Sequence, residues 1–221
     1  MPGIPISGAV VFDLDGTLVD TADDFIPVVQ QLQAENGFAP TAPERIRQSV
    51  SNGARALVCL GLALDSDDPR VEVHRLRLLE LYEAILGQHA RLYPGMDTLI
   101  RRLEERNIPW GIATNKPRAF TIPLLDTLNL RPGSVVCPDD VAQPKPHPEA
   151  LFLACRQLDR SAASSIYVGD HLRDIEAGRA AGMRTVAAAY GYLEPGDDAH
   201  SWGADALVQH SSEVEACLFP H

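Results

Sequence analysis

Short, largely apolar runs recur along the chain, and amphipathic segments separate them in its second half. The first run covers residues 8–13 and ends abruptly in an acidic turn that contains glycine, a pattern typical of a central strand in a parallel sheet. Five similar runs follow, at residues 109–113, 134–137, 165–168, 184–187 and 206–208. We expect each of the six runs to form a β-strand.

Helical patterns lie between these runs from residue 93 onward. Residues 97–106 place their apolar side chains on one face, and residues 148–158 begin with a proline at a first-turn position. Residues 174–181 predict a helix that ends before Gly182, which suits a left-handed backbone. This alternation predicts an α/β fold built on a Rossmann-like, doubly wound parallel sheet.

The interval after the first strand does not follow this alternation, because residues 17–90 contain far more chain than one crossover helix needs. The spacing of Thr21 and Asp24 is that of a capping box and predicts a helix that runs to Gly37. Two more helical stretches are expected around residues 43–60 and between Asp68 and Gly87. The predicted division is an α/β core of residues 1–17 and 91–221, interrupted by an all-helical domain of residues 18–90.

Charge and cysteine content narrow the class of protein. The 221 residues include 19 Lys+Arg and 30 Asp+Glu, a net charge of −11, which argues against a nucleic-acid or anionic-membrane partner. The longest stretch without charge, residues 1–12, is too short to span a bilayer, and no basic residue precedes it as in a signal peptide. The four cysteines show no close pairs, so we expect a reduced, cytoplasmic protein that is a monomer or a homodimer.

Four polar clusters follow predicted strands, at the edge of an open α/β sheet where ligands bind. They are Asp13-Leu-Asp15-Gly-Thr17, Thr114-Asn115-Lys116, Pro144-Lys145-Pro, and Gly169-Asp170-His-Leu-Arg-Asp174. Two carboxylates about 4 Å apart repel by roughly 4 kcal/mol at an effective dielectric near 20. A cation is therefore expected among these acids, and their oxygen ligands favour Mg²⁺ together with a substrate phosphate.

In this order the four clusters resemble the motifs of the haloacid dehalogenase superfamily, in its phosphatase branch with a helical cap. The resemblance covers nearly the whole chain and implies that Asp13 is the nucleophile and forms an aspartyl phosphate. It implies that Asp15 is the general acid and then the general base. Thr114 and the backbone of Asn115 would hold phosphoryl oxygens, and Lys145 would neutralise their charge.

The same resemblance implies a Mg²⁺ site formed by Asp13, the carbonyl of Asp15, and Asp170. Asp174 would support this site, although it is alternatively a simple helix N-cap. Dehalogenases of the superfamily lack an acid at the position of Asp15, so phosphoryl transfer is expected rather than dehalogenation. A phosphoglucomutase-like relative would share the core motifs.

Three further segments point to a substrate class. Residues 51–56 and 202–205 resemble phosphoglycolate phosphatases, and with residues 190–195 they more closely resemble N-acetylmuramate 6-phosphate phosphatases of cell-wall recycling. This implies a small phosphorylated metabolite as the partner, with Asn52 and Arg55 of the cap at its non-phosphate end. A bidentate Arg55 would suit a carboxylate, although a cap arginine is more often solvated. The alternatives are 2-phosphoglycolate as the substrate, or a non-catalytic protein that binds a phosphometabolite.

Overall fold

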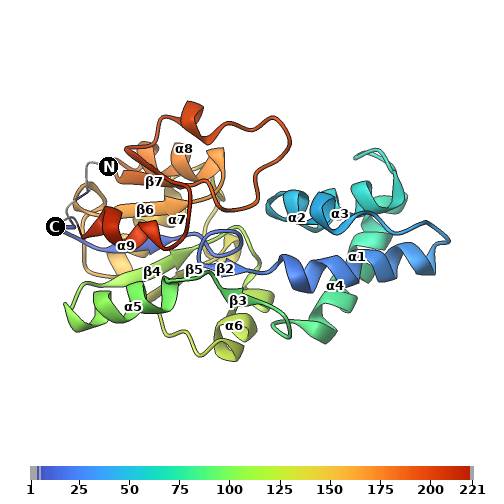
Figure 1. Cartoon of the computed structure of the whole chain (residues 1–221), viewed down its shortest axis with the longest axis horizontal. Helices are drawn as coiled ribbons and strands as arrows, with labels where there is room; N and C mark the ends of the chain where they lie inside the picture. The colour runs from blue at the N-terminus through green and yellow to red at the C-terminus, as the bar shows by residue number, and fades with distance from the viewer. Residues whose placement is uncertain (1–3, 5, 220–221) are drawn as a thin grey trace.

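A six-stranded parallel sheet forms the centre of the larger half of the molecule. The computed structural model describes residue 4 and residues 6–219, and it orders the strands β5-β4-β1-β6-β7-β8 (Figure 1). The strands are β1 (Val10–Phe12), β4 (Trp110–Ala113), β5 (Ser134–Val136), β6 (Ile166–Gly169), β7 (Arg184–Ala188) and β8 (Ala206–Val208). All six predicted strands are confirmed, and β1 lies at the middle, paired with β4 and β6.

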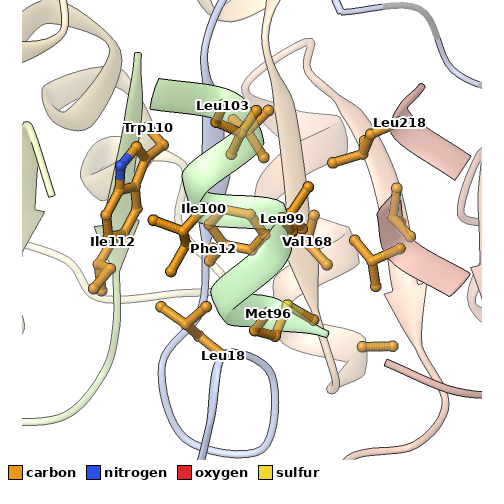
Figure 2. Packing of buried hydrophobic residues seen from close by; sticks show 14 of the residues in the cluster. Phe12, Leu18, Met96, Leu99, Ile100, Leu103, Trp110, Ile112, Val168 and Leu218 are labelled. Carbon is orange, nitrogen blue, oxygen red and sulfur yellow. The ribbon is translucent and has the colours of Figure 1, made fainter. Parts of the chain in front are cut away.

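Helices cover both faces of the sheet, as a doubly wound fold requires. The helices around the sheet are α5 (Met96–Glu105), α6 (Arg118–Thr127), α7 (Glu149–Gln157), α8 (Leu172–Ala180) and α9 (Glu213–Leu218). Alternation along β1 explains the two layers, because Phe12 faces a cluster with α5, α6 and α9, whereas Val11 faces one with α7 and α8. Figure 2 shows Leu99 and Leu103 of α5 packed over Phe12.

A separate group of helices extends from one end of the sheet, on the right of Figure 1. It consists of α1 (Ala22–Glu35), α2 (Pro43–Ser49), α3 (Gly53–Leu62) and α4 (Arg70–Ile85), and we call these four helices the helical unit. The helical unit has its own apolar cluster, which includes Leu32, Leu57 and Leu78. The chain enters and leaves it through two paired strands, β2 (Val19–Asp20) and β3 (Arg91–Leu92).

Some details of the helices differ from the sequence predictions. The stretch expected at residues 43–60 is divided into α2 and α3 by a short 3₁₀ helix (Val50–Asn52), and α6 and α9 were not predicted individually. Three more 3₁₀ helices lie at Pro138–Asp140, Ala162–Ser164 and Ala199–Trp202. The predicted capping box at the start of α1 is wrong. The Thr21 hydroxyl does not cap the helix, and the Asp24 carboxylate accepts from the backbone N–H groups of Gly87 and His89, each at 2.7 Å.

The ends of the predicted core lie outside the described residues, namely 1–3, 5, 220 and 221. Part of the stretch on which the prediction against a signal peptide depends is therefore not described. Among the helices that the structure does describe, none combines the length and the apolarity needed to cross a membrane.

Candidate active site

The sheet brings the predicted acidic clusters to one place. Asp13 directly follows β1 and Asp170 directly follows β6, and the two strands are neighbours in register. Asp174 joins them from the first turn of α8, where its carboxylate accepts from the backbone N–H of His171 at 3.1 Å. His171 is the N-cap residue of this helix, so Asp174 is not the N-cap but the third helical residue.

Lys145 lies at the centre of these acids and is almost completely buried. Its Nζ atom is 2.8 Å from Asp13 Oδ1 and 2.7 Å from Asp174 Oδ1, and it donates to the hydroxyl of Tyr167 at 2.8 Å. Burial lowers the pKa of Lys145, but the two carboxylates outweigh burial and raise it above its usual value. The side chain is therefore an ammonium that holds the nucleophile candidate in place.

The acids carry more negative charge than Lys145 balances. Carboxylate oxygens of Asp13, Asp170 and Asp174 lie within 4.8 Å of one another, so three carboxylates face one ammonium and leave a formal charge of −2. Burial is the larger cause and repulsion from Asp13 and Asp174 the smaller one, and together they raise the pKa of Asp170 to about 8. Burial also raises the pKa of Asp13 to about 6, against the opposing effect of Lys145. This cluster could hold a divalent metal ion, because oxygen donors and a twofold charge deficit suit a hard cation.

Hydrogen bonds and close packing fix the carboxylate of Asp170 in place. It accepts hydrogen bonds from the Thr17 hydroxyl and from the backbone N–H of Tyr192, both at 2.9 Å. Gly16 has a φ of +83°, and a Cβ atom there would lie 2.1 Å from Asp170 Oδ2. Only glycine therefore allows the turn after β1 to pass beside this carboxylate.

Asp15 is bound from two directions. The Thr21 hydroxyl donates to its Oδ1 atom at 2.6 Å, and Lys116 Nζ lies 3.1 Å from the same oxygen. Lys116 was not predicted as a site residue, although it is the third member of the Thr114–Lys116 cluster. The sequence signal for it was its place in the polar cluster that follows β4, a strand that ends beside β1.

Thr114 and Asn115 follow β4 on the opposite side of Asp13 from β6. The Thr114 hydroxyl accepts from the backbone N–H of Lys116 at 3.1 Å. The Asn115 side chain donates to the carbonyl of Lys145 at 3.0 Å and accepts from its N–H at 3.1 Å. This pair of hydrogen bonds to the main chain fixes the loop that carries Lys145. The sequence did not indicate this role for the Asn115 amide.

A cavity of about 370 Å³ lies between these residues and the helical unit. Its lining includes Asp13, Asp15, Thr114, Lys116 and Lys145 on the core side, and Phe25, Asn52, Arg55, Arg75 and Tyr82 on the helical side. Asn52 is bound to the core by hydrogen bonds with Arg173 and Glu194. Arg55 donates to the Ser66 carbonyl. The two predicted cap residues therefore line the cavity while they are also bound to protein groups.

Comparison with known proteins places this geometry in a family. A family model described as "Haloacid dehalogenase-like hydrolase" matches residues 10–188. The chain belongs to this family. An N-acetylmuramic acid 6-phosphate phosphatase of Pseudomonas putida is 45% identical over 212 residues, which cover 95% of each chain. A phosphoglycolate phosphatase of Xanthomonas campestris pv. campestris is 39% identical over 208 residues, 93% of this chain and 94% of that protein.

Solved structures of the haloacid dehalogenase-like family share the fold. A crystal structure described as a predicted phosphoglycolate phosphatase from Haemophilus somnus 129pt has a TM-score of 0.82 at 20% identity and covers 93% of this chain and 95% of that one. The family model and the curated relatives identify the protein as a phosphatase of this family. The resemblance stated from the four motifs is thereby confirmed.

Proposed function

We propose that the protein hydrolyses N-acetylmuramic acid 6-phosphate through a phosphoryl group carried on Asp13. The observation that carries the proposal is the arrangement of Asp13, paired with buried Lys145, beside Asp15 at the base of one cavity. The relative that is 45% identical over 95% of both chains supports the choice of substrate. A cavity of about 370 Å³ also falls in the range of sites that hold drug-sized ligands, so it admits a sugar phosphate.

In the first step, a carboxylate oxygen of Asp13 attacks phosphorus, and the bond from phosphorus to the sugar oxygen breaks. Asp15 transfers a proton to the departing sugar oxygen. Lys145 and the backbone after Thr114 stabilise the charge on the phosphoryl oxygens. Lys145 is already held by Asp13 and Asp174, so this stabilisation needs no rearrangement.

In the second step, a water oxygen attacks phosphorus and the bond between phosphorus and Asp13 breaks. Asp15, now ionised, takes the proton of that water, and inorganic phosphate leaves with Asp13 restored as a carboxylate. One residue thus serves as acid and then as base, which requires its carboxylate to keep its position through both steps.

Mg²⁺ is the metal ion that we propose for the acidic cluster. Asp13, Asp170 and the carbonyl of Asp15 would hold it, with Asp174 bound to Lys145 behind them. The residues fit the ion, because they offer only oxygen atoms as ligands and, together with Lys145, carry a formal charge of −2. When bound, Mg²⁺ neutralises phosphoryl charge and orients the ester.

Residues 18–90 are proposed to act as a cap that excludes water from the reaction. Phe25 and Tyr82 supply an apolar wall of the cavity, and Arg55 and Arg75 also line it. Glu72 pairs with Arg75 at 2.5 Å and lies 3.9 Å from Arg55. The carboxylate of the lactyl group of the sugar would replace Glu72 at one of these arginines.

The test compares kcat/KM for N-acetylmuramic acid 6-phosphate and for 2-phosphoglycolate in the presence of Mg²⁺. We expect the sugar phosphate to be preferred by about 100-fold, near 2.7 kcal/mol of discrimination in the transition state. Asp13→Asn protein and EDTA-treated protein are the blanks. A preference for 2-phosphoglycolate would overturn the substrate, and turnover by Asp13→Asn protein would overturn the mechanism.

A further inference from the structure

The sequence contains two lysines, Lys116 and Lys145, among 19 basic residues, and both are buried in the candidate active site. Every other basic residue is an arginine. A lysine ammonium is a compact charge, whereas a guanidinium is planar and wider. In a chain with so many arginines, a lysine at a buried position indicates a site that needs an ammonium group, which is smaller than a guanidinium. Lys145 has its explanation in Asp13 and Asp174, but Lys116 has no role in the reaction described above.

Lys116 meets Asp15 from the core side of the cavity. It is the third residue after β4, and its side chain is 5% exposed. Its Nζ atom lies 3.1 Å from Asp15 Oδ1 and 3.4 Å from Oδ2, so it faces both carboxylate oxygens. A charged group that contacts both oxygens restricts rotation of the carboxylate more than a contact to one oxygen does.

Two aromatic rings of the helical unit hold Lys116 from the other side. Phe25 of α1 and Tyr82 of α4 stack with their ring centroids 4.1 Å apart and their planes at 11°. Lys116 Nζ lies 4.7 Å from the Tyr82 centroid and 5.2 Å from the Phe25 centroid. Both distances are within the range of cation–π attraction. We call these two rings and Asp15 the Lys116 cage.

We propose that Lys116, held in this cage, is the positioning residue that aims the Asp15 carboxylate at the leaving oxygen of the ester. This rests on the proposed function, in which Asp15 is the acid and base. Lys116 acts through Asp15 and takes no proton itself. Its removal should therefore slow the steps in which Asp15 moves a proton and spare those in which it does not.

The leaving group separates this role from a structural one. Sugar alkoxide needs a proton to depart, whereas p-nitrophenolate leaves without one. Since kcat/KM covers the steps up to release of the leaving group, it senses this difference. Lys116→Met should lower kcat/KM for N-acetylmuramic acid 6-phosphate by about 10- to 100-fold and for p-nitrophenyl phosphate by less than about 3-fold. Phe25→Leu should give a smaller loss with the same selectivity, about 3- to 10-fold.

Asp15→Asn is the reference, and Arg101→Met, which removes an exposed cation of α5, is the control and should change neither rate. If Asp15→Asn shows no dependence on the leaving group, the acid–base part of the proposed function fails. The proposal for Lys116 is overturned if Asp15→Asn slows the sugar phosphate more than p-nitrophenyl phosphate but Lys116→Met does not. Lys116→Met would then lower kcat/KM equally for the two esters, or for neither of them. Equal losses would assign Lys116 to phosphate binding.

A second measurement avoids any variant at Lys116. Protein labelled with ¹⁵N at the lysine side chains has two ammonium groups to observe. The signal that moves in Phe25→Leu protein belongs to Lys116, because that ring lies against it. We expect Asp15→Asn to move the same signal. If Asp15→Asn leaves that signal in place, the Lys116 cage does not exist in solution.

Discussion

Asp170→Asn should make the metal-free protein more stable, although it replaces a buried carboxylate that accepts hydrogen bonds from Thr17, Ser51 and Tyr192. Burial and the charges of Asp13 and Asp174 raise the pKa of Asp170 to about 8, against a usual value of 3.8. An acid with a raised folded-state pKa costs stability as the pH rises above its unfolded pKa. The metal-free protein should therefore lose stability from about pH 4 to about pH 8.

The size of this effect follows from the pKa values. At pH 7 the interval above the unfolded pKa is about three units, which corresponds to a cost on the order of 4 kcal/mol. Asparagine removes the charge and can still bind its neighbours, since the Thr17 hydroxyl can accept from the amide while the amide oxygen accepts from Tyr192 N–H. We expect a net gain of about 2–4 kcal/mol, or about 4–16 °C in Tm for a chain of this size.

Thermal unfolding in EDTA at pH 7 measures this gain, and a repeat at pH 4 should reduce it to near zero. Asp24→Asn is the matched control, because Asp24 is also fully buried but accepts from two backbone N–H groups, and this variant should be less stable than wild type. Saturating Mg²⁺ should stabilise wild type by about 2.7 kcal/mol at 100 times Kd, and Asp170→Asn much less. A Tm of Asp170→Asn at or below wild type in EDTA would refute the electrostatic reasoning.

Three further variants test other parts of the structure. Leu103→Ala leaves a cavity between α5 and the sheet and should cost about 2–5 kcal/mol of unfolding free energy in denaturant titration, with kcat unchanged; a cost below 1 kcal/mol would contradict the packing in Figure 2. Gly16→Ala drives a Cβ atom into Asp170 and should lower kcat/KM about 100-fold or more at fixed Mg²⁺, and near-normal activity would contradict the close approach. Asn115→Ala releases the main chain of the Lys145 loop and should lower kcat about 10-fold or more with a smaller effect on KM, whereas a rise in KM alone would show that Asn115 acts in binding.

The strands and the acids at their ends were predictable because each strand of a parallel sheet has a distinctive local sequence pattern. Most strands are short runs that are apolar on both faces, as in β1, where Val11 and Phe12 enter different cores. Parallel strands end at the same edge, so Asp13 and Asp170 were expected at one edge of the sheet, and the structure adds that β1 and β6 are neighbours there. No knowledge of distant loops was needed for this part.

The contacts between the core and the helical unit could not be predicted, because they depend on the position and orientation of the helical unit relative to the core. Thr21 has the sequence spacing of a helix cap, but its hydroxyl accepts no hydrogen bond from the helix backbone and donates to the Asp15 carboxylate instead. The place of Lys116 beside Phe25 depends equally on this orientation. The sequence pattern of a helix contains no information on which distant side chain will meet it.

The burial of both lysines also determines how the protein reacts with reagents that modify lysine side chains. Reagents that acylate lysine need an accessible nitrogen, and in the folded molecule Lys116 and Lys145 lie behind carboxylates and rings. Lysine acylation then proceeds only through molecules that have opened, so its rate reports the frequency of opening. A ligand that holds the cavity shut would slow the labelling, and attachment through lysine would modify the reaction centre instead of the surface.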